Sequence, residues 1–221
     1  MQQQAKQSPF NLFKDRRLVV EALLFTAIVA IGIASRFWLV EMPNFKPIAA
    51  LVLFGGFFFR RAWPAIAALA LVMAVSDLKL GVYDWKLAVS VYVSLGLACW
   101  LGVWVKRSVS QSDNGKTPRI GYKQAGRFAI ASLAMSTAFY LLTNGAVWWM
   151  GQWYPESWAG LINCYAAGLP FYRATLLGDL FFTGVLVGAC CCVQVCVERF
   201  SGLAAETTPG VGCNLPVLAD C

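Results

Sequence analysis

The 221-residue chain contains no histidine, and only 13% of its residues are charged, whereas soluble domains carry about 25%. The absence of histidine excludes the usual general base of a Ser-His or Cys-His enzyme. No G-x-x-x-x-G-K-[S/T] segment is present, so any ATP-driven step would need a separate subunit. We therefore expect no catalytic residues, no metal site and no cofactor.

Cysteine is present but lacks the spacing of a metal site. Four of the eight cysteines lie in the segment ACCCVQVC, at positions 190, 191, 192 and 196. This is not a zinc-binding pattern, and adjacent cysteines on a helix point in different directions. We interpret them as small apolar residues that face lipid or other helices.

Hydrophobic residues, by contrast, make up 59% of the chain, which predicts an all-α integral membrane protein. Six apolar segments are candidate transmembrane helices: Leu18–Ser35, Phe45–Phe59, Ala62–Val75, Lys86–Val105, Phe128–Met150 and Thr175–Val197. The second and third are shorter than the about 20 residues that cross a bilayer. They are interpreted as two short spans, the third extending through Leu80, with a re-entrant pair as the alternative.

The distribution of positive charge predicts the topology. With the N-terminus inside, thirteen of the eighteen Lys and Arg residues lie on the inner side, as the positive-inside rule requires. A re-entrant pair would place Arg60 and Arg61 inside the membrane, which is unfavourable. We expect a polar cytoplasmic N-terminus (1–17), a six-helix N-in/C-in domain (18–199) with a basic cytoplasmic loop (106–127), and a disordered cytoplasmic tail (200–221), in the inner (plasma) membrane.

Polar residues recur four positions apart in three spans, and such residues share one helix face. The rows are Lys86, Ser90 and Ser94 in the fourth span, Ser132, Ser136, Tyr140, Asn144 and Trp148 in the fifth, and Thr175, Asp179 and Thr183 in the sixth. Asp179 needs a partner or water inside the membrane, and Arg173 and Lys86 are candidates. Thr175 is a candidate N-cap of the sixth span. The rows indicate either a structural ion-pair or hydroxyl network between helices or a polar cavity open to the outside.

The segment Pro43–Pro47 (PNFKP) adds a second polar feature at the outer side. Its prolines keep the backbone out of a regular helix, so it is interpreted as the rigid rim of an outward-facing pocket. Asp77, at the end of the third span, either ends that helix or joins the pocket. The predicted ligand-binding residues are Asn44, Lys46, Asp77, Tyr140, Asn144, Trp148, Arg173 and Asp179.

Small residues form a separate row in the first span, at Ala22, Thr26, Ala30 and Ala34. Gly184 and Gly188 form a GxxxG pair in the sixth span. Small residues allow close approach of another helix. Both motifs are common in membrane helices, so the alternatives are packing inside this protein or contact with the helices of a separate membrane subunit.

The motifs resemble those of an uncharacterised family of small multi-pass bacterial membrane proteins over roughly Leu18 to Val197. The matching run begins at Asn44-Phe45 and continues through Pro47, Ala50 and Leu53-Phe54-Gly55-Gly56. Other matching features are Pro64, Ser76-Asp77, Gly81, Thr143-Asn144, Trp148, Tyr154, Gly160-Leu161, Cys164-Tyr165, Pro170-Phe171, Thr175 and Gly178-Asp179.

That family is in turn similar to the substrate-binding S components of energy-coupling factor (ECF) transporters. The resemblance implies a six-helix protein that captures a small molecule from outside and works with a transmembrane coupling subunit and ATPase subunits. It also implies that 36–46 gates the pocket and that Ala30 and Ala34 touch the coupling subunit. The histidines expected of a transition-metal S component are absent.

The sequence therefore predicts a substrate-capture subunit for uptake, not an enzyme, whose partners are a small-molecule substrate, membrane lipids and these subunits, with no nucleic acid. One alternative is an intramembrane enzyme acting on a lipid or isoprenoid, in which Asp77 and Asp179 would approach one another around Mg²⁺. The other is a structural or assembly protein, which would have no pocket.

Overall fold

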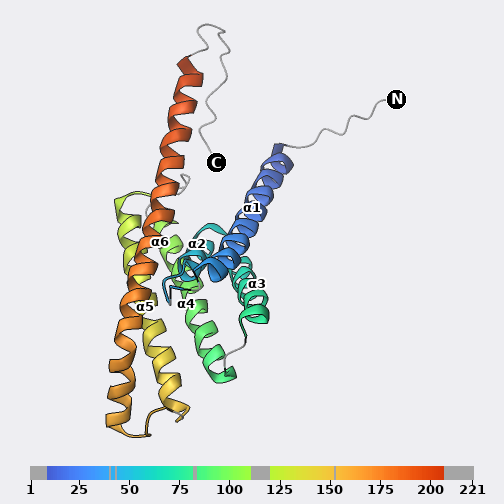
Figure 1. The fold of residues 1–221 in the computed structure, drawn as a ribbon. Helices are drawn as coiled ribbons and strands as arrows, with labels where there is room; N and C mark the ends of the chain where they lie inside the picture. Colours follow the sequence, from blue (N-terminus) through green and yellow to red (C-terminus); the bar gives the residue numbers. More distant parts are fainter. Residues whose placement is uncertain are drawn as a thin grey trace.

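The computed structural model describes residues 9–39, 41–42, 44–81, 84–110, 120–151 and 153–206. Within them the chain forms six helices: α1 Pro9–Trp38, α2 Ile48–Phe58, α3 Trp63–Leu80, α4 Trp85–Ser110, α5 Tyr122–Trp149 and α6 Trp158–Glu206 (Figure 1). In the described part, five of these are long and apolar enough to cross a membrane. The prediction of an all-helical membrane protein is confirmed. Among these six helices, α2 falls short of the length of a membrane span: it has 11 residues and is about 16 Å long at 1.5 Å per residue.

Local sequence signals set most helix boundaries. Helix α2 begins directly after Pro47, because proline fits the start of a helix but not its interior. Helix α3 ends at Gly81, whose φ of +90° suits glycine. The backbone N–H of Gly121, before α5, donates to Gln124 Oε1 at 3.0 Å. The hydroxyl of Ser157 accepts from the N–H of Gly160 at 3.1 Å, as an N-cap does.

Helix α6 begins much earlier than predicted, at Trp158 instead of Thr175, and it contains Pro170. A proline removes one backbone hydrogen bond, but membrane helices tolerate this where neighbouring groups satisfy the backbone. The prediction that Thr175 is an N-cap is wrong, since its hydroxyl donates to the carbonyl of Phe171 one turn earlier, at 3.0 Å. The helix also continues to Glu206, into the segment predicted to be a disordered tail.

The bounds of the other polar segments also differ from the predictions. Helix α1 begins at Pro9, inside the predicted polar N-terminus, and the predicted loop 106–127 is narrowed by α4 and α5 to 111–121. Residues 1–8, 111–119 and 207–221 lie outside the described residues, as do Pro43 of the PNFKP segment and residue 83.

Helix α2 forms the centre of the bundle and contacts all five other helices. Its residues from Ile48 to Phe57 are all buried, as expected for a helix that is apolar on every side. At its C-terminal end, the ring of Phe54 stacks on that of Phe128 of α5, with centroids 4.6 Å apart. Phe57 packs edge-on against the same ring at 5.0 Å. These rings close the core between α2 and α5.

Glycines let α2 and α4 pack with their backbones in contact. A Cβ atom on Gly56 would lie 2.3 Å from the carbonyl oxygen of Cys99, and one on Gly102 would lie 2.0 Å from that of Leu53. Both distances are shorter than any real Cβ contact, and backbone atoms cannot move aside as a side chain can. The close approach of α2 to α4 therefore requires glycine at both positions.

Basic residues gather at one end of the bundle, which holds the α2–α3 connection, the C-terminal end of α4 and the N-terminal end of α5. The ammonium of Lys106 donates to the carbonyl of Phe59 at 2.6 Å, and Arg127 donates to the carbonyl of Ser108 at 2.9 Å. Arg60 and Arg61 are exposed on the surface of this end. We call this the basic end of the molecule.

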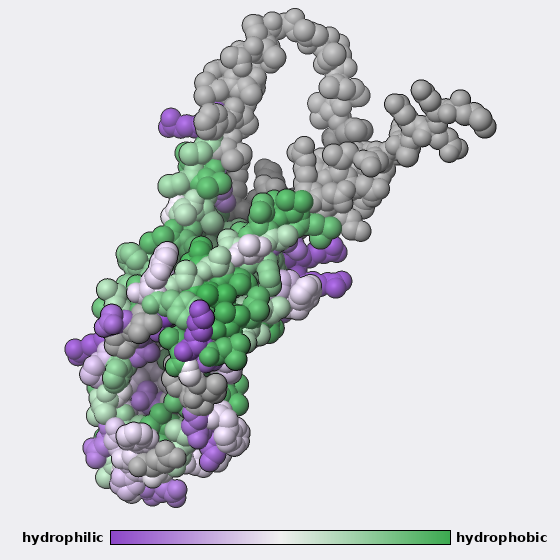
Figure 2. Space-filling view, turned by 45° about the vertical axis from the view of Figure 1, so that its right-hand side comes forward, coloured by the Kyte–Doolittle hydropathy of each residue, from purple (hydrophilic) through white to green (hydrophobic). Residues whose placement is uncertain are grey.

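The opposite end holds the α1–α2, α3–α4 and α5–α6 connections. The α5–α6 hairpin reaches farthest in this direction, at the bottom of Figure 1. Figure 2 shows hydrophobic residues covering the middle of one face, with hydrophilic residues gathered mainly below them, toward the hairpin. We call this the hairpin end.

The small-residue row of α1 does not pack inside the protein. Ala22, Thr26 and Ala30 are exposed and Ala34 is half-buried, so the internal-packing alternative is wrong for this row. Gly184 and Gly188 are also exposed, with open space around them. Helix α1 instead meets α3 through Gly32, where a Cβ atom would lie 2.7 Å from a methyl carbon of Val72.

Candidate functional site

A cavity of about 310 Å³ lies between the α1–α2 connection and helices α4, α5 and α6. Ligand pockets typically occupy about 300–1,000 Å³. Its polar lining residues are Arg36, Asn44, Lys46, Ser94, Tyr140, Thr143, Asn144, Tyr172, Thr175 and Asp179. Its apolar lining residues are Ile48, Ala49, Met73, Leu87, Val91, Leu95, Met135, Phe139 and Phe171.

The corner between α1 and α2 forms one wall and is held against α6. Asn44 has a φ of +62°, a conformation that asparagine adopts more readily than most residues. The ring of Phe45 lies between Phe181 and Phe182, with centroid distances of 5.9 and 5.3 Å. A Cβ atom on Gly178 would lie 3.2 Å from the Cα of Phe45. The corner therefore sits on α6, with Asn44 and Lys46 facing the cavity.

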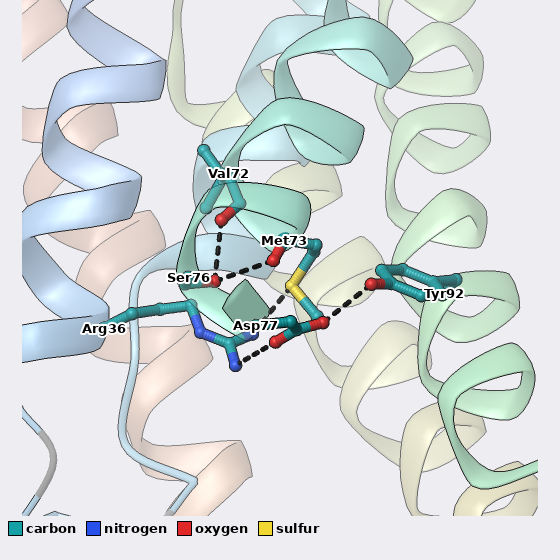
Figure 3. A network of polar contacts seen from close by, with 6 residues as sticks. All are labelled: Arg36, Val72, Met73, Ser76, Asp77 and Tyr92. Atoms are coloured by element: carbon teal, nitrogen blue, oxygen red, sulfur yellow. Dashed lines mark hydrogen bonds and ion pairs between the residues drawn. The ribbon is translucent and has the colours of Figure 1, made fainter. Parts of the chain in front are cut away.

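A buried ion pair joins α1, α3 and α4 beside the cavity (Figure 3). The guanidinium of Arg36 donates to Asp77 Oδ1 at 2.7 Å through Nη2, and to the sulfur of Met73 at 2.8 Å through Nη1. The hydroxyl of Tyr92 donates to the other carboxylate oxygen of Asp77 at 2.7 Å. The side chains of Arg36 and Asp77 are only 6% and 8% exposed.

Two cationic side chains, Arg36 of this pair and Lys46 of the α1–α2 connection, lack some of the hydrogen-bond or ion-pair partners that a buried charge needs. Arg36 Nε is buried and has no acceptor among the described residues. Lys46 is half-buried, and within the same part of the chain its ammonium has no ion-pair partner. Burial lowers the pKa of Lys46 below its usual value, and the positive charge of Arg36 lowers it further. The α1 side of the cavity therefore carries uncompensated positive charge.

The α5–α6 wall carries a buried carboxyl group. Asp179 is 3% exposed and accepts a hydrogen bond from Ser136 at 2.7 Å. It forms no ion pair with any described residue. One turn further toward the basic end, the hydroxyls of Ser132 and Thr183 are buried and lack partners in the described ranges. The predicted rows of α5 and α6 thus face each other as a polar seam that opens into the cavity at Asp179.

Aromatic residues of α5 and α6 form the wall nearest the hairpin end. The hydroxyl of Tyr140 donates to the carbonyl of Tyr165 at 2.6 Å, and its ring centroid lies 4.8 Å from that of Tyr172. The amide of Asn144 donates to the carbonyl of Tyr140 at 2.8 Å. These bonds within and between the two helices fix the position of both rings.

A second groove, of about 700 Å³, lies between α4 and α5. Its lining residues include Trp85, Lys86, Ser90, Gly145 and Trp149, and the remainder are aliphatic or Met side chains and Ala. It is larger than the cavity, but few polar groups converge on it. Binding sites for small polar molecules combine an apolar wall with a few placed polar groups, so the cavity at Arg36, Lys46 and Asp179 is the candidate site.

Comparison with known proteins assigns the chain to a family. Residues 16–200 match a family of unknown function (DUF6580). The chain belongs to the DUF6580 family. No curated protein and no solved structure matches it. The predicted membership of a family of membrane proteins without an assigned function is thus confirmed for this DUF6580 chain.

Of the eight predicted ligand-binding residues, the DUF6580 fold brings five to the cavity: Asn44, Lys46, Tyr140, Asn144 and Asp179. Asp77 lies behind the lining, bound to Arg36. Trp148 is half-buried away from the cavity, and its indole N–H donates to the carbonyl of Pro155 at 3.1 Å. Arg173 is exposed. Neither Arg173 nor Lys86 is the partner of Asp179.

Sequence reasoning did not include Arg36 among the ligand-binding residues, although it placed 36–46 in the segment that gates the pocket. Its partner Asp77 is 41 residues away in the sequence, so no local pattern connects the two residues. The row of the fourth span also divides between two sites. Ser94 lines the cavity, whereas Lys86 and Ser90 line the second groove. The signal that points to Arg36 is a single cation at the end of an apolar span.

Proposed function

We propose that this DUF6580 protein is a membrane-embedded small-molecule binding protein that captures a substrate for uptake. The observation that carries the proposal is the cavity itself, in which polar side chains from four helices and the α1–α2 connection converge beside an apolar and aromatic wall. Such a combination is the usual form of a ligand site. A protein with a purely structural role has no need of it.

The proposed topology places the cavity on the extracytoplasmic side of the inner (plasma) membrane. The basic end, with Arg60, Arg61, Lys106 and Arg127, would face the cytoplasm according to the positive-inside rule. Both termini would be cytoplasmic, and α2 would complete six spans in spite of its length. The α1–α2 corner, which lines the cavity, lies at the opposite end.

A working resemblance to ECF S components extends the proposal to partners. The chain has no G-x-x-x-x-G-K-[S/T] segment, so energy for uptake would come from ATPase subunits through a transmembrane coupling subunit. The exposed row of Ala22, Thr26, Ala30 and Ala34 on α1 is the proposed contact with that subunit.

No specific observation favours the enzyme alternative. It required Asp77 and Asp179 to approach one another, but their carboxylates have different partners, Arg36 and Tyr92 for the first and Ser136 for the second.

Native mass spectrometry of the gently extracted protein tests the proposal. A retained small molecule, or co-purifying coupling and ATPase subunits, would support substrate capture. Asp179→Asn should then reduce the fraction of protein carrying the molecule, with little change in unfolding temperature, while Arg173→Gln on the exposed face of α6 should change neither. A protein repeatedly free of ligand and partners would contradict the proposal. Normal retention by a poorly folded Asp179→Asn protein would instead identify a structural role.

A further inference from the structure

The charges around the cavity indicate the class of ligand. Arg36 is buried and lines the cavity, with Asp77 neutralising one side of its guanidinium and Nε left without an acceptor in the described chain. Lys46 lines the same cavity and has no counter-ion there. Two cations that repel each other in a half-buried site are unfavourable unless an anion joins them. A bound anion would accept hydrogen bonds from both.

The remaining lining limits the charge and the shape of that anion. Asp77 offsets the charge of Arg36, so the α1 side of the cavity presents about one net positive charge. Asp179 on the opposite wall accepts a hydrogen bond from Ser136 and adds no positive charge that could balance a second negative charge. The rest of the wall combines aliphatic side chains with the aromatic residues Phe139, Tyr140, Phe171 and Tyr172. These features favour a monoanion attached to a flat apolar group over a phosphate dianion.

We infer that Arg36 and Lys46 form the binding point for a carboxylate, and that the ligand is a small aromatic carboxylate whose ring lies against the tyrosines of α5 and α6. The inference rests on the proposed function, since it names the class of substrate for the same cavity. A carboxylate has the two acceptor oxygens that a guanidinium N–H and an ammonium can share. The ring of the ligand would lie against the rings of Tyr140 and Tyr172, which already contact one another.

Matched probes test the inference on the full-length protein in detergent. Calorimetric titration would compare benzoate and indole-3-acetate with their neutral amides, benzamide and indole-3-acetamide, and with phenyl phosphate. The carboxylates should bind at least about tenfold more tightly than the amides, because a charge-assisted hydrogen bond is worth more than one tenfold step in affinity. The carboxylates should also bind more tightly than phenyl phosphate.

Variants of Lys46 then assign the preference to a residue. Lys46→Gln should remove most of the preference for carboxylate over amide, and Lys46→Arg should keep it. Lys79→Gln is the matched control, because Lys79 is an exposed cation of the same end that lies 5.5 Å over the ring of Phe37, away from the cavity. Size-exclusion profiles would confirm that each variant is folded, and the comparison of probes on the unmodified protein needs no variant.

The outcomes separate the inference from the proposed function. Equal binding of amides and carboxylates, or a neutral molecule retained in native mass spectrometry, would overturn the carboxylate inference and leave small-molecule capture standing. Tighter binding of phenyl phosphate would overturn the choice of a monoanion. No binding of any probe, together with no retained molecule, would overturn both.

Discussion

Replacing Asp77 with alanine should destabilise the protein strongly, because it leaves the guanidinium of Arg36 buried without its carboxylate. The two side chains are 6% and 8% exposed and lie 2.7 Å apart. Two unit charges about 4 Å apart interact by about 4 kcal/mol at an effective dielectric constant of about 20. Breaking a buried pair by removing one partner costs about 3–5 kcal/mol. We therefore expect a loss of about 4 kcal/mol.

Two further variants separate buried charge from the loss of a contact. Tyr92→Phe removes the hydrogen bond to Asp77 Oδ2 and leaves both charges in place, so it should cost about 1.5 kcal/mol. The double variant Arg36→Met, Asp77→Leu leaves no buried charge and should be more stable than Asp77→Ala alone. Free energies of unfolding would be measured by reversible unfolding in mixed detergent micelles with increasing dodecyl sulfate. If Asp77→Ala cost no more than Tyr92→Phe, or if the double variant recovered nothing, the reasoning from buried charge would be refuted.

Three other predictions concern packing, titration and accessibility. Gly102→Ala should destabilise the protein by about 1–3 kcal/mol in the same unfolding assay, because the added Cβ atom would meet the backbone of α2. Gly96 of the same helix has open space around it, so Gly96→Ala should be neutral or slightly stabilising. The pKa of Lys46 lies below its usual value of 10.5, so the affinity for benzoate should fall as the pH rises through that lowered pKa and the ammonium loses its charge. Lys46→Arg should abolish this fall. A pH-independent affinity in the unmodified protein would contradict the prediction. In chains that retain one cysteine, N-ethylmaleimide should modify Cys192, which is exposed on the surface of α6, faster than buried Cys99, and equal rates in the folded protein would show that the α2–α4 contact is loose.

The sequence predicted the number and approximate position of the helices because each is an apolar run bounded by charge, proline or glycine. The start of α6 was missed because Pro170 was treated as lying before the helix. The segment 158–174 instead extends α6 over α5. There, Gly168 fits against the Asn144 side chain, whose Oδ1 would lie 2.4 Å from an added Cβ. Packing of this kind offsets one lost backbone hydrogen bond, and no local signal reveals it.

For the candidate site, periodicity was a good guide within a helix and a poor one between helices. The four-residue spacing identified the rows that contain Ser136 and Asp179, and the structure brings these two side chains together. The partner of Asp77 was not predictable, because ion pairing between distant segments depends on how the helices pack. Arg173 illustrates a different error. It lies six residues before Asp179, which rotates it by about 240° around a helix with 3.6 residues per turn, and it is exposed.

The length of α2 has an electrical consequence in the proposed orientation. Water in the cavity would carry the outside potential down to Ile48 and Ala49, at the start of α2. The membrane voltage would then fall across the about 16 Å of α2 instead of the about 30 Å of the hydrocarbon layer, giving a local field nearly twice as strong. Moving one elementary charge across a full 100 mV involves about 2.3 kcal/mol of electrical work. A carboxylate that enters the cavity would cross almost none of this voltage, so its entry would involve almost no electrical work. A negative interior would therefore not oppose capture of an anion, and the electrical work would be concentrated in its passage past α2.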